Sequence, residues 1–267
     1  MDFSKLFSLE GRVAVITGGS RGIGRMLAEG FLAAGCAKVY ITARKAAVVE
    51  ETARELGDRV IALPGDISTL AGIEALAEDL ARLEPKIDIL VNNAGVAWGA
   101  DFEDFPEGGW DKVMNLNVKT PFFLTQKLHG LLKAAASAGQ PAKVINIASI
   151  DGMRVNPWET YSYQASKAAV IHLTRRMAAR LIKDNIVVTC IAPGAYPSEM
   201  NKVAARKPEE SARGIPSGRI GGVEDIAGGA IYLASRAGDY VVGTTIPIDG
   251  GIVNAWIPSD FVDPSGH

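Results

Sequence analysis

The chain has 267 residues, 48% of them hydrophobic, and its 28 basic and 30 acidic residues give a net charge of −2 and a pI near 6.0. This length, together with 29 glycines, suits one large α/β domain. Because Lys and Arg are scattered along the sequence without excess, we expect no nucleic-acid partner.

The sequence also argues against a membrane, a disulfide and a metal. No basic start is followed by an apolar run, and no stretch reaches the roughly 18 apolar residues of a membrane span. Cys36 and Cys190 lie far apart, and the histidines, His129, His172 and His267, have no metal-ligand spacing. We therefore expect a soluble cytoplasmic protein with no metal and no membrane partner.

The chain opens with the pattern of strand, glycine-rich turn and helix, over residues 12–17, 18–24 and 25–34. Glycines let the backbone approach a ligand, and the free amides at a helix start attract a pyrophosphate. The alternative is that the glycines only close a tight turn. We predict cofactor contacts from Gly18, Ser20, Arg21, Gly22, Ile23 and Gly24.

A second strand, predicted over residues 38–42, leads to Arg44, where a fold that prefers NAD would place an acidic residue for the ribose hydroxyls. Guanidinium groups match phosphate geometry well. Arg44 and Arg21 together therefore predict a grip on a 2′-phosphate, which favours NADP(H) over NAD(H). The alternative is that both arginines are solvated surface residues.

Strands and helices continue to alternate, over residues 45–56, 60–63, 70–83 and 87–91. In the loop between the strand at 60–63 and the helix at 70–83, Asp66 is expected to bond an adenine amino group and Ile67 to cover the ring. An acidic residue at a helix start explains Asp66 almost as well. The strand at 87–91 leads to Asn93, Ala94 and Gly95, which suit either close ligand contact or the end of a strand, and both interpretations hold together.

A helix is predicted from Trp110 through Pro121 towards Lys133, and it carries Asn117. The strand at 143–147 then delivers Ser149, and a second helix carries Tyr163 and Lys167. Four residues make about one helical turn, so these two side chains share a face. A lysine charge about 5 Å away is expected to lower the pKa of the phenol from its ordinary value near 10 by about two units.

The last two strands are predicted at 186–191 and 245–248. Between them lies a charged segment bracketed by prolines, which we expect to form a substrate lid at 195–217. A helix is predicted after it, at 223–234. A tail follows at about 252–267. The alternation predicts a single-domain, Rossmann-like, doubly wound parallel sheet of about seven strands, with helices on both faces and the ligand at the carboxyl ends of the strands.

Six ordered motifs, namely Thr17-Gly18-x3-Gly22-x-Gly24, Asn92-Asn93-Ala94-Gly95, Asn117, Ser149, Tyr163-x3-Lys167 and Pro193-Gly194, resemble the short-chain dehydrogenase/reductase family across about residues 8–252. Within it the chain looks most like bacterial β-ketoacyl reductases, including the rhamnolipid-associated kind. The resemblance implies that Tyr163 is the acid/base, that Ser149 orients the substrate oxygen, and that Lys167 lowers the pKa of the tyrosine and bonds the nicotinamide ribose. It also implies a water held by Asn117.

The same resemblance places Pro193, Gly194 and Ser198 near the nicotinamide, with Ser198 in place of the usual threonine. It further implies a homotetramer (or homodimer) in which the helices of Trp110 and Tyr163 pack between subunits. Trp98, Trp158 and Tyr196 are candidates for an apolar substrate groove, with plain packing as the alternative.

The resulting hypothesis is NADP(H)-dependent reduction of a ketone, such as a β-ketoacyl thioester or β-ketoester, to a secondary alcohol. One alternative is an NAD(P)-linked alcohol, polyol or steroid dehydrogenase that works in the oxidative direction. A remote alternative is a nucleotide-sensing protein that keeps the fold without the chemistry.

Overall fold

Seven parallel strands form one sheet in the order β3-β2-β1-β4-β5-β6-β7, in a computed structural model that describes residues 2–198, 201 and 206–257. Every strand lies within about two residues of its prediction, and the doubly wound fold is confirmed. The strands are β1 Val13–Thr17, β2 Lys38–Ala43, β3 Val60–Pro64, β4 Ile89–Asn92, β5 Ala142–Ile147, β6 Ile186–Pro193 and β7 Thr245–Ile248.

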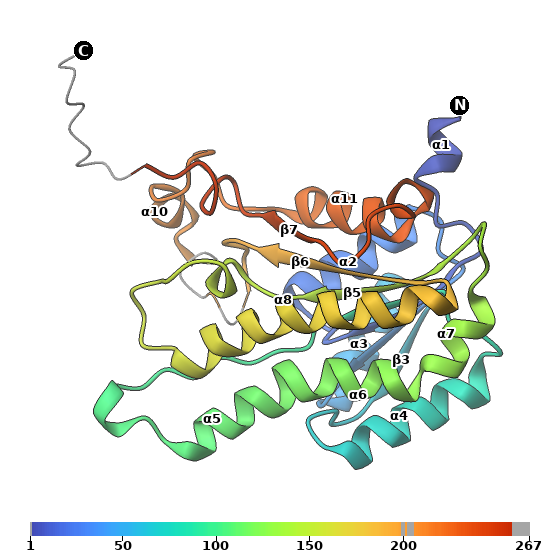
Figure 1. Cartoon of the computed structure of the whole chain (residues 1–267), viewed down its shortest axis with the longest axis horizontal. Coiled ribbons are helices and arrows are strands. Elements are labelled where there is room, and N and C mark those ends of the chain that lie inside the picture. Colours follow the sequence, from blue (N-terminus) through green and yellow to red (C-terminus); the bar gives the residue numbers. More distant parts are fainter. Residues whose placement is uncertain (1, 199–200, 202–205, 258–267) are drawn as a thin grey trace.

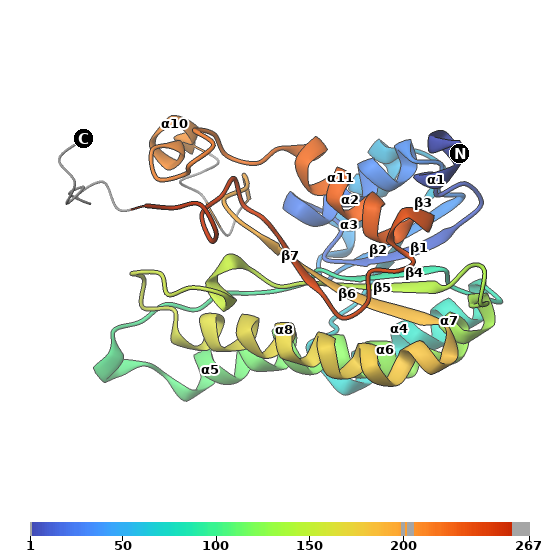
Figure 2. The same ribbon diagram turned by 45° about the horizontal axis from the view of Figure 1, so that its top comes forward.

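Helices cover both faces of the sheet, as Figures 1 and 2 show. One layer consists of α2 Gly22–Ala33, α3 Ala46–Leu56 and α11 Val223–Ala234. The other consists of α4 Leu70–Leu83, α5 Glu107–Met114, α6 Thr120–Lys127, α7 His129–Ala135 and α8 Tyr161–Leu181. The short helices α1 Phe3–Leu6 and α10 Pro208–Ala212 lie outside these layers.

The core has one part on each face of the sheet because successive strand residues point to opposite sides. In β1, Ala14 and Ile16 pack against the α2 layer, whereas Val13 and Val15 pack against the α4 layer. All residues of β1, β4, β5 and β6 are buried. Such continuous apolar strands are expected where a parallel sheet is covered on both faces.

The strand order reverses direction between β1 and β4, which are neighbours in space but not in sequence. At such a switch point the connections leave the two strands on opposite faces and open a crevice at their carboxyl ends. The glycine-rich turn follows β1, and Asn93 follows β4. The sheet topology therefore brings two predicted ligand-binding segments to the same edge.

The helix predicted from Trp110 to Lys133 is not continuous. It begins at Glu107, passes through a π-helical segment, η2 Asn115–Lys119, and ends at Lys127, after which α7 begins at His129. Pro121 explains part of this difference, because it has no N–H to donate to the carbonyl of residue 117, four positions earlier. A wider π turn at this point is a common feature of functional sites.

The predicted lid and tail are described only in part, because residues 199–200, 202–205 and 258–267 lie outside the described residues. Where the two segments are described, they share a small apolar cluster. In this cluster Ile215 of the lid segment and Ile252 of the tail pack with Ile150, the residue that follows Ser149. The base of the lid is therefore tied to the loop that carries the predicted serine. Within the described residues, no helix combines the length and the apolar character needed to span a membrane.

Candidate active site

The glycine-rich turn after β1 is closed by contacts that only glycine permits. A Cβ on Gly24 would lie 2.2 Å from the Gly18 carbonyl oxygen, and Gly18 itself has a φ of 67°. Asn93 ties the turn to β4, because its Nδ2 donates to the carbonyls of Thr17 (2.9 Å) and Gly18 (3.2 Å). The two interpretations of the glycines therefore hold together: they close a tight turn, and that turn leaves bare backbone at the start of α2.

Thr17 is a residue whose role sequence reasoning did not specify. Its Oγ1 accepts hydrogen bonds from the backbone N–H groups of Asn93 and Ala94, both at 2.9 Å. The hydroxyl thus fixes the end of β4 against the end of β1. A threonine as the last residue of a buried strand, where an aliphatic side chain would otherwise pack, was the available signal.

The outer rim of the turn carries the two predicted arginines. Arg21 is the N-cap residue of α2 and Arg44 follows β2, and both are exposed. The charge of Arg44 reaches Asp66, whose pKa is held below its usual range mainly by hydrogen bonds from Ser68 and to a smaller degree by Arg44. Arg44 and Asp66 therefore border the same part of the crevice.

The loop of Asp66 and Ile67 departs from one detail of the prediction. Asp66 does not cap α4, since Thr69 does so by accepting from the N–H of Gly72 at 3.1 Å. The Ile67 side chain is buried in the core, and its carbonyl accepts from the Thr120 hydroxyl at 2.7 Å. The face of the Ile67 side chain is therefore taken up by the core.

Lys167 and Tyr163 lie side by side on α8, as their spacing predicts. The lysine Nζ is 5.5 Å from the centroid of the tyrosine ring, and the side chain is buried, at 4% exposure. The ammonium donates one hydrogen bond, to the Ile147 carbonyl at 2.9 Å. Since an ammonium has three donors, the described residues leave two of them for a ligand. Gly95 lies next to this ammonium: a Cβ added to Gly95 would be 3.5 Å from the Lys167 Nζ.

The predicted lowering of the tyrosine pKa is wrong for the ligand-free protein. Burial raises the pKa of Tyr163 to about 12, a hydrogen bond with Ser149 opposes this, and the charge of Asp151 adds to the rise. Burial also lowers the pKa of Lys167 to about 8. The argument from sequence counted the attraction between the charges but not the loss of water around both groups, which is the larger effect here.

Ser149 and Asn117 meet the same pair from two other elements. Ser149 follows β5, caps a short 3-10 helix (Ile150–Gly152) by accepting from the Asp151 N–H at 3.1 Å, and lies near enough to the Tyr163 phenol to oppose the rise in its pKa. Asn117 lies in the π-helical segment and exchanges two 2.9 Å hydrogen bonds with the backbone of Val96. Its Nδ2 also donates to Ser166 at 2.9 Å. Both N–H donors of the amide are thus used within the protein.

A ladder of buried polar side chains supports the site from below, and sequence reasoning missed it. Asn92 donates to Asn146 at 2.9 Å, and Asn146 donates to the hydroxyl of Thr174 at 2.9 Å. These residues come from β4, β5 and α8, so the ladder fixes the three elements that carry Asn93, Ser149 and Tyr163. Two asparagines inside otherwise apolar strands were the only signal in the sequence.

The segment after β6 closes the crevice from the other side. The Gly194 N–H donates to the Ile248 carbonyl at 3.0 Å, and a Cβ at position 194 would collide with the backbone of Asp249. Ser198 lies against the glycine-rich turn, because a Cβ added to Gly22 would be 3.3 Å from the Cβ of Ser198. The predicted nicotinamide segment and the predicted phosphate segment therefore approach one another.

The three substrate candidates differ in their surroundings. Trp158 is 66% exposed on the loop before α8. Trp98 is half-buried, with its ring packed against Gly109 of α5 and the Lys112 ammonium 5.1 Å from the ring centroid. The prediction for Tyr196 needs correction. Its side chain is buried against Gly221, and its hydroxyl donates to the Ile248 carbonyl at 3.3 Å. Packing accounts for Tyr196, so we remove it from the substrate groove.

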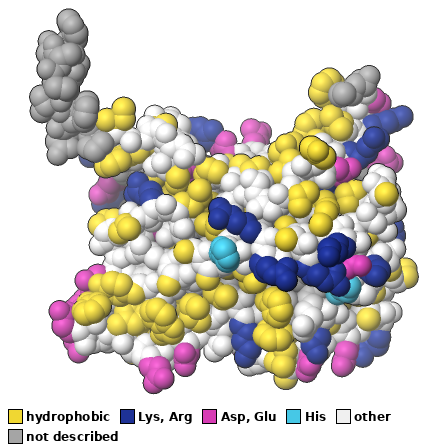
Figure 3. Space-filling view, in the orientation of Figure 1, with side chains coloured by type: hydrophobic (Ala, Val, Ile, Leu, Met, Phe, Trp, Pro, Cys, Tyr) yellow, Lys and Arg dark blue, Asp and Glu magenta, His cyan; other side chains and the backbone are white. Residues whose placement is uncertain are grey.

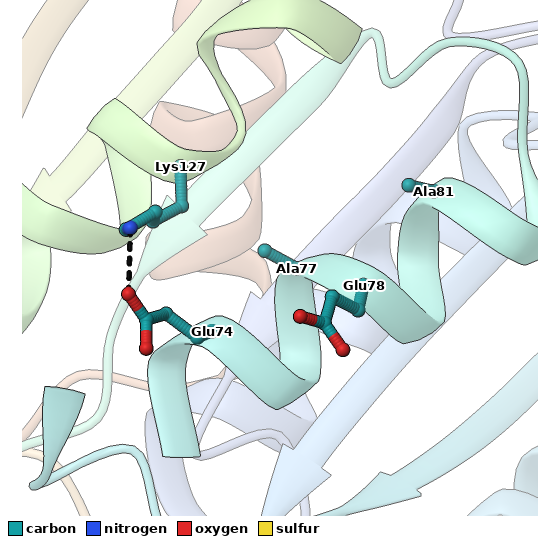
Figure 4. Close-up of a pocket in the computed structure, with 5 residues that line it drawn as sticks. All are labelled: Glu74, Ala77, Glu78, Ala81 and Lys127. Atoms are coloured by element: carbon teal, nitrogen blue, oxygen red, sulfur yellow. Dashed lines mark hydrogen bonds and ion pairs between the residues drawn. The ribbon is translucent and has the colours of Figure 1, made fainter. Parts of the chain in front are cut away.

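A separate hollow of about 310 Å³ lies between α4 and α6, where Ala77 and Ala81 leave room beside the ion pair of Glu74 and Lys127 (Figure 4). It is an open depression in a helix layer, and none of the predicted site residues lines it.

The fold and this constellation define a short-chain dehydrogenase/reductase, and the chain belongs to that family of oxidoreductases. A family model described as enoyl-(acyl carrier protein) reductase matches residues 18–253.

Among similar proteins is a rhamnolipids biosynthesis 3-oxoacyl-[acyl-carrier-protein] reductase of Pseudomonas aeruginosa, 48% identical over 92% of this chain and 97% of the relative. A 2-dehydro-3-deoxy-D-gluconate 5-dehydrogenase of Escherichia coli is 42% identical over 92% and 96%. The RhlG/NADP active-site complex of Pseudomonas aeruginosa superposes with a TM-score of 0.89 and 47% identity, over 93% of this chain and 99% of that one.

Proposed function

We propose that this protein uses NADP(H) to reduce a ketone, such as a β-ketoacyl thioester or β-ketoester, to a secondary alcohol. The observation that carries the proposal is the meeting of Tyr163, Lys167 and Ser149 beside a glycine turn at the switch point of the sheet. The similar Pseudomonas aeruginosa reductase, which acts on 3-oxoacyl groups, and the RhlG structure, which is a complex with NADP, support the same assignment.

The residues fit a nicotinamide dinucleotide, because the turn at Gly18–Gly24 offers bare backbone and the buried Lys167 ammonium has two donors left. The cofactor supplies the hydride. Tyr163 donates its proton to the carbonyl oxygen, while Ser149 hydrogen-bonds the same oxygen and stabilises the charge that develops there. Lys167 holds ribose hydroxyls through its remaining N–H groups, and its place beside the phenol supports proton transfer.

The alternative of an NAD(P)-linked alcohol or polyol dehydrogenase is favoured by one observation, the 42% identity with the gluconate-type dehydrogenase. Side-by-side assays, with NADPH for the carbonyl compounds and NADP+ for the polyols, separate the two. We expect β-ketoacyl thioesters and β-ketoesters to be reduced, and polyols and 2-keto-sugar acids to be turned over at least about tenfold less efficiently, because Trp158 presents an apolar surface next to the site. Preference for a sugar acid or polyol would establish the alternative, and NADPH binding without turnover of any carbonyl compound would indicate a nucleotide sensor.

The preference for NADP(H) over NAD(H) rests on Arg44 and Arg21 at the rim of the turn. We expect Arg44→Asp to raise KM for NADPH at least about tenfold and to leave KM for NADH unchanged or lower, since a lost charged contact to phosphate costs about 1.5–3 kcal/mol. Cofactor titrations by initial rate measure both constants. Arg54→Ala on exposed α3 is the matched control. A wild-type preference for NADH would contradict the assignment.

We further propose a homotetramer whose first interface joins the α5–α8 faces of two copies. Figure 3 shows acidic side chains gathered at one end of this face and a basic row along α8 towards the other. The acidic end carries Glu103, Asp104, Glu107 and Asp111, and the basic end carries Arg175, Arg176, Arg180 and Lys183, all exposed. Two copies related by a two-fold axis place each end against its opposite, with the exposed Trp110 and Phe122 between them.

The family resemblance implies four copies, and the edge strand β7, with the fully exposed Tyr240 in the segment before it, offers a second face for them. Sedimentation velocity is expected to give a tetramer for the wild type. The double change Arg175→Glu and Arg176→Glu is expected to give smaller species, because it sets like charges against each other. A monomeric wild type, or a variant that stays tetrameric, would contradict this arrangement.

A cytoplasmic location is also part of the proposal. Cys36 and Cys190 are both free and buried, as thiols are in a reducing compartment.

A further inference from the structure

The loop between Ser149 and Tyr163 is held by polar side chains, although it displays apolar ones. Residues 153–160 connect the short helix that Ser149 caps to α8, which carries Tyr163. Met153, Val155 and Trp158 are 40%, 86% and 66% exposed on it. A loop that keeps such side chains in water in a fixed arrangement is expected to use them as a contact surface.

Asn156 is the centre of this loop. Its side chain is buried, at 7% exposure, and Oδ1 accepts from the Trp158 N–H at 2.9 Å and from Gln164 Nε2 at 3.2 Å. Its Nδ2 is buried without a partner among the described residues. Because a buried unpaired donor costs stability, packing alone does not explain an asparagine here. The Asn156 Oδ1 atom explains it, because this atom accepts hydrogen bonds from both the loop and α8.

Gln164 completes the contact from the other side. It follows Tyr163 directly in the first turn of α8, and its Nε2 donates to the Trp158 carbonyl at 3.1 Å as well as to Asn156. The same Nε2 also lies 3.5 Å from the Thr160 hydroxyl, so one amide group reaches three acceptors between Asn156 and the start of α8. The backbone of Trp158 is in this way bonded at its N–H by Asn156 and at its carbonyl by Gln164.

The other end of the loop is fixed by packing. A Cβ on Gly152 would lie 2.5 Å from the backbone of Lys167, so the loop leaves Ser149 in direct contact with α8. Near its exit, the Ala100 N–H donates to the Glu159 carbonyl at 3.2 Å. The loop is therefore anchored on both sides of Trp158, and the two amide side chains fix the backbone from which the indole projects.

From these contacts we propose that Gln164 and Asn156 form a clamp that positions Trp158 as an apolar wall of the substrate entrance, and that Gln164 thereby determines specificity for ketones with a long apolar chain. Gln164 is a positioning residue and touches no reacting atom. This proposal rests on the proposed ketone reduction and adds the substrate class: an acyl chain that extends past the β-keto group onto the indole.

The test uses the full-length enzyme, NADPH, and two thioesters, acetoacetyl-CoA and 3-oxodecanoyl-CoA. Gln164→Glu keeps the size of the side chain but removes the donor, and Gln164→Met removes it without adding charge. Both are expected to lower kcat/KM for the long substrate about three- to tenfold, the effect of one or two ordinary hydrogen bonds, and to leave kcat/KM for the short one within about twofold.

Two further variants complete the design. Asn156→Asp keeps an acceptor for both N–H groups and is expected to retain the preference for the long chain, whereas Asn156→Leu is expected to lose it. Glu159→Gln changes a charge on the same loop outside the clamp, where its partner is the Tyr161 hydroxyl at 3.1 Å, and is expected to change nothing.

A readout independent of activity is trypsin cleavage after Arg154, which we expect to be accelerated in Gln164→Glu and Gln164→Met but not in Glu159→Gln. An unchanged ratio of long to short kcat/KM in Gln164→Glu and Gln164→Met overturns the clamp, and so does an equal loss on both substrates. A wild type that reduces neither thioester overturns the proposed function instead. If the Gln164 variants are then still cleaved faster by trypsin, Gln164 and Asn156 hold the loop but do not select a substrate.

Discussion

Replacement of Tyr163 by phenylalanine is expected to lower kcat for ketone reduction by about 10²–10⁴-fold and to leave NADPH binding nearly unchanged. The phenol is the proton donor of the proposed reaction, and a positioned general acid contributes about 10²–10⁴-fold. The ring itself remains, so its packing on α8 and its contact with the Lys167 ammonium, 5.5 Å from the centroid, are kept. Initial rates with a β-ketoester and NADPH titration by fluorescence measure the two effects separately.

Tyr161 provides the matched control, because Tyr161→Phe removes a phenol two residues away on the same helix. Its hydroxyl donates to Glu159 at 3.1 Å and has no lysine beside it, since residue 165 is alanine. We expect this variant to keep near wild-type turnover. A folded Tyr163→Phe protein with substantial activity would show that another group donates the proton.

The strands and most helices could be predicted because their sequences carry one dominant physical requirement. Parallel strands covered on both faces are mostly apolar, as in β1 and β6, and the bounds of β7 and α4 agree with the prediction to the residue. The site motifs were predicted for a related reason. A glycine turn, a Tyr and Lys one helical turn apart, and a serine after a buried strand are local patterns, and the sheet topology brings their ends together.

The remaining features depend on contacts between distant segments. Nothing near Tyr196 in the sequence indicates that Gly221 leaves space for its ring or that Ile248 accepts its hydroxyl. The π-helical segment at Asn117 and the clamp of Asn156 on Gln164 are likewise tertiary. The predicted direction of the Tyr163 pKa shift was wrong for the same reason, because the loss of hydration is set by all surrounding elements and not by the spacing of two residues.

Removal of the lysine charge by Lys167→Met is expected to damage cofactor binding and chemistry together, with at least about tenfold weaker NADPH binding and about a hundredfold or greater loss of kcat. The ammonium is buried, it has one acceptor in the described protein, and it lies near Gly95. Without it, the ribose hydroxyls lose their partner and the phenol loses the neighbouring charge. NADPH titration and initial rates on the same preparation measure both losses.

The pH dependence of the wild type gives a second view of the same group. Burial lowers the pKa of Lys167 to about 8, so the ammonium is present below that pH and is lost as the pH rises through it. We therefore expect kcat/KM for reduction to fall above about pH 8, although the Tyr163 phenol, with a pKa of about 12 in the ligand-free protein, still holds its proton there. A profile that stays flat to pH 10 would contradict a role for the lysine charge.

Loss of folding does not explain the expected effect of Lys167→Met. A pKa below the ordinary value means that the folded protein holds this proton less tightly than the unfolded chain does, so the buried charge opposes folding at neutral pH. Its removal is expected to leave the thermal midpoint unchanged or higher. Lys119→Met, at an exposed position of the π-helical segment, is the matched control and is expected to behave as wild type. If Lys167→Met binds NADPH normally and loses only kcat, the lysine acts on the tyrosine alone and its proposed contact with the ribose is wrong.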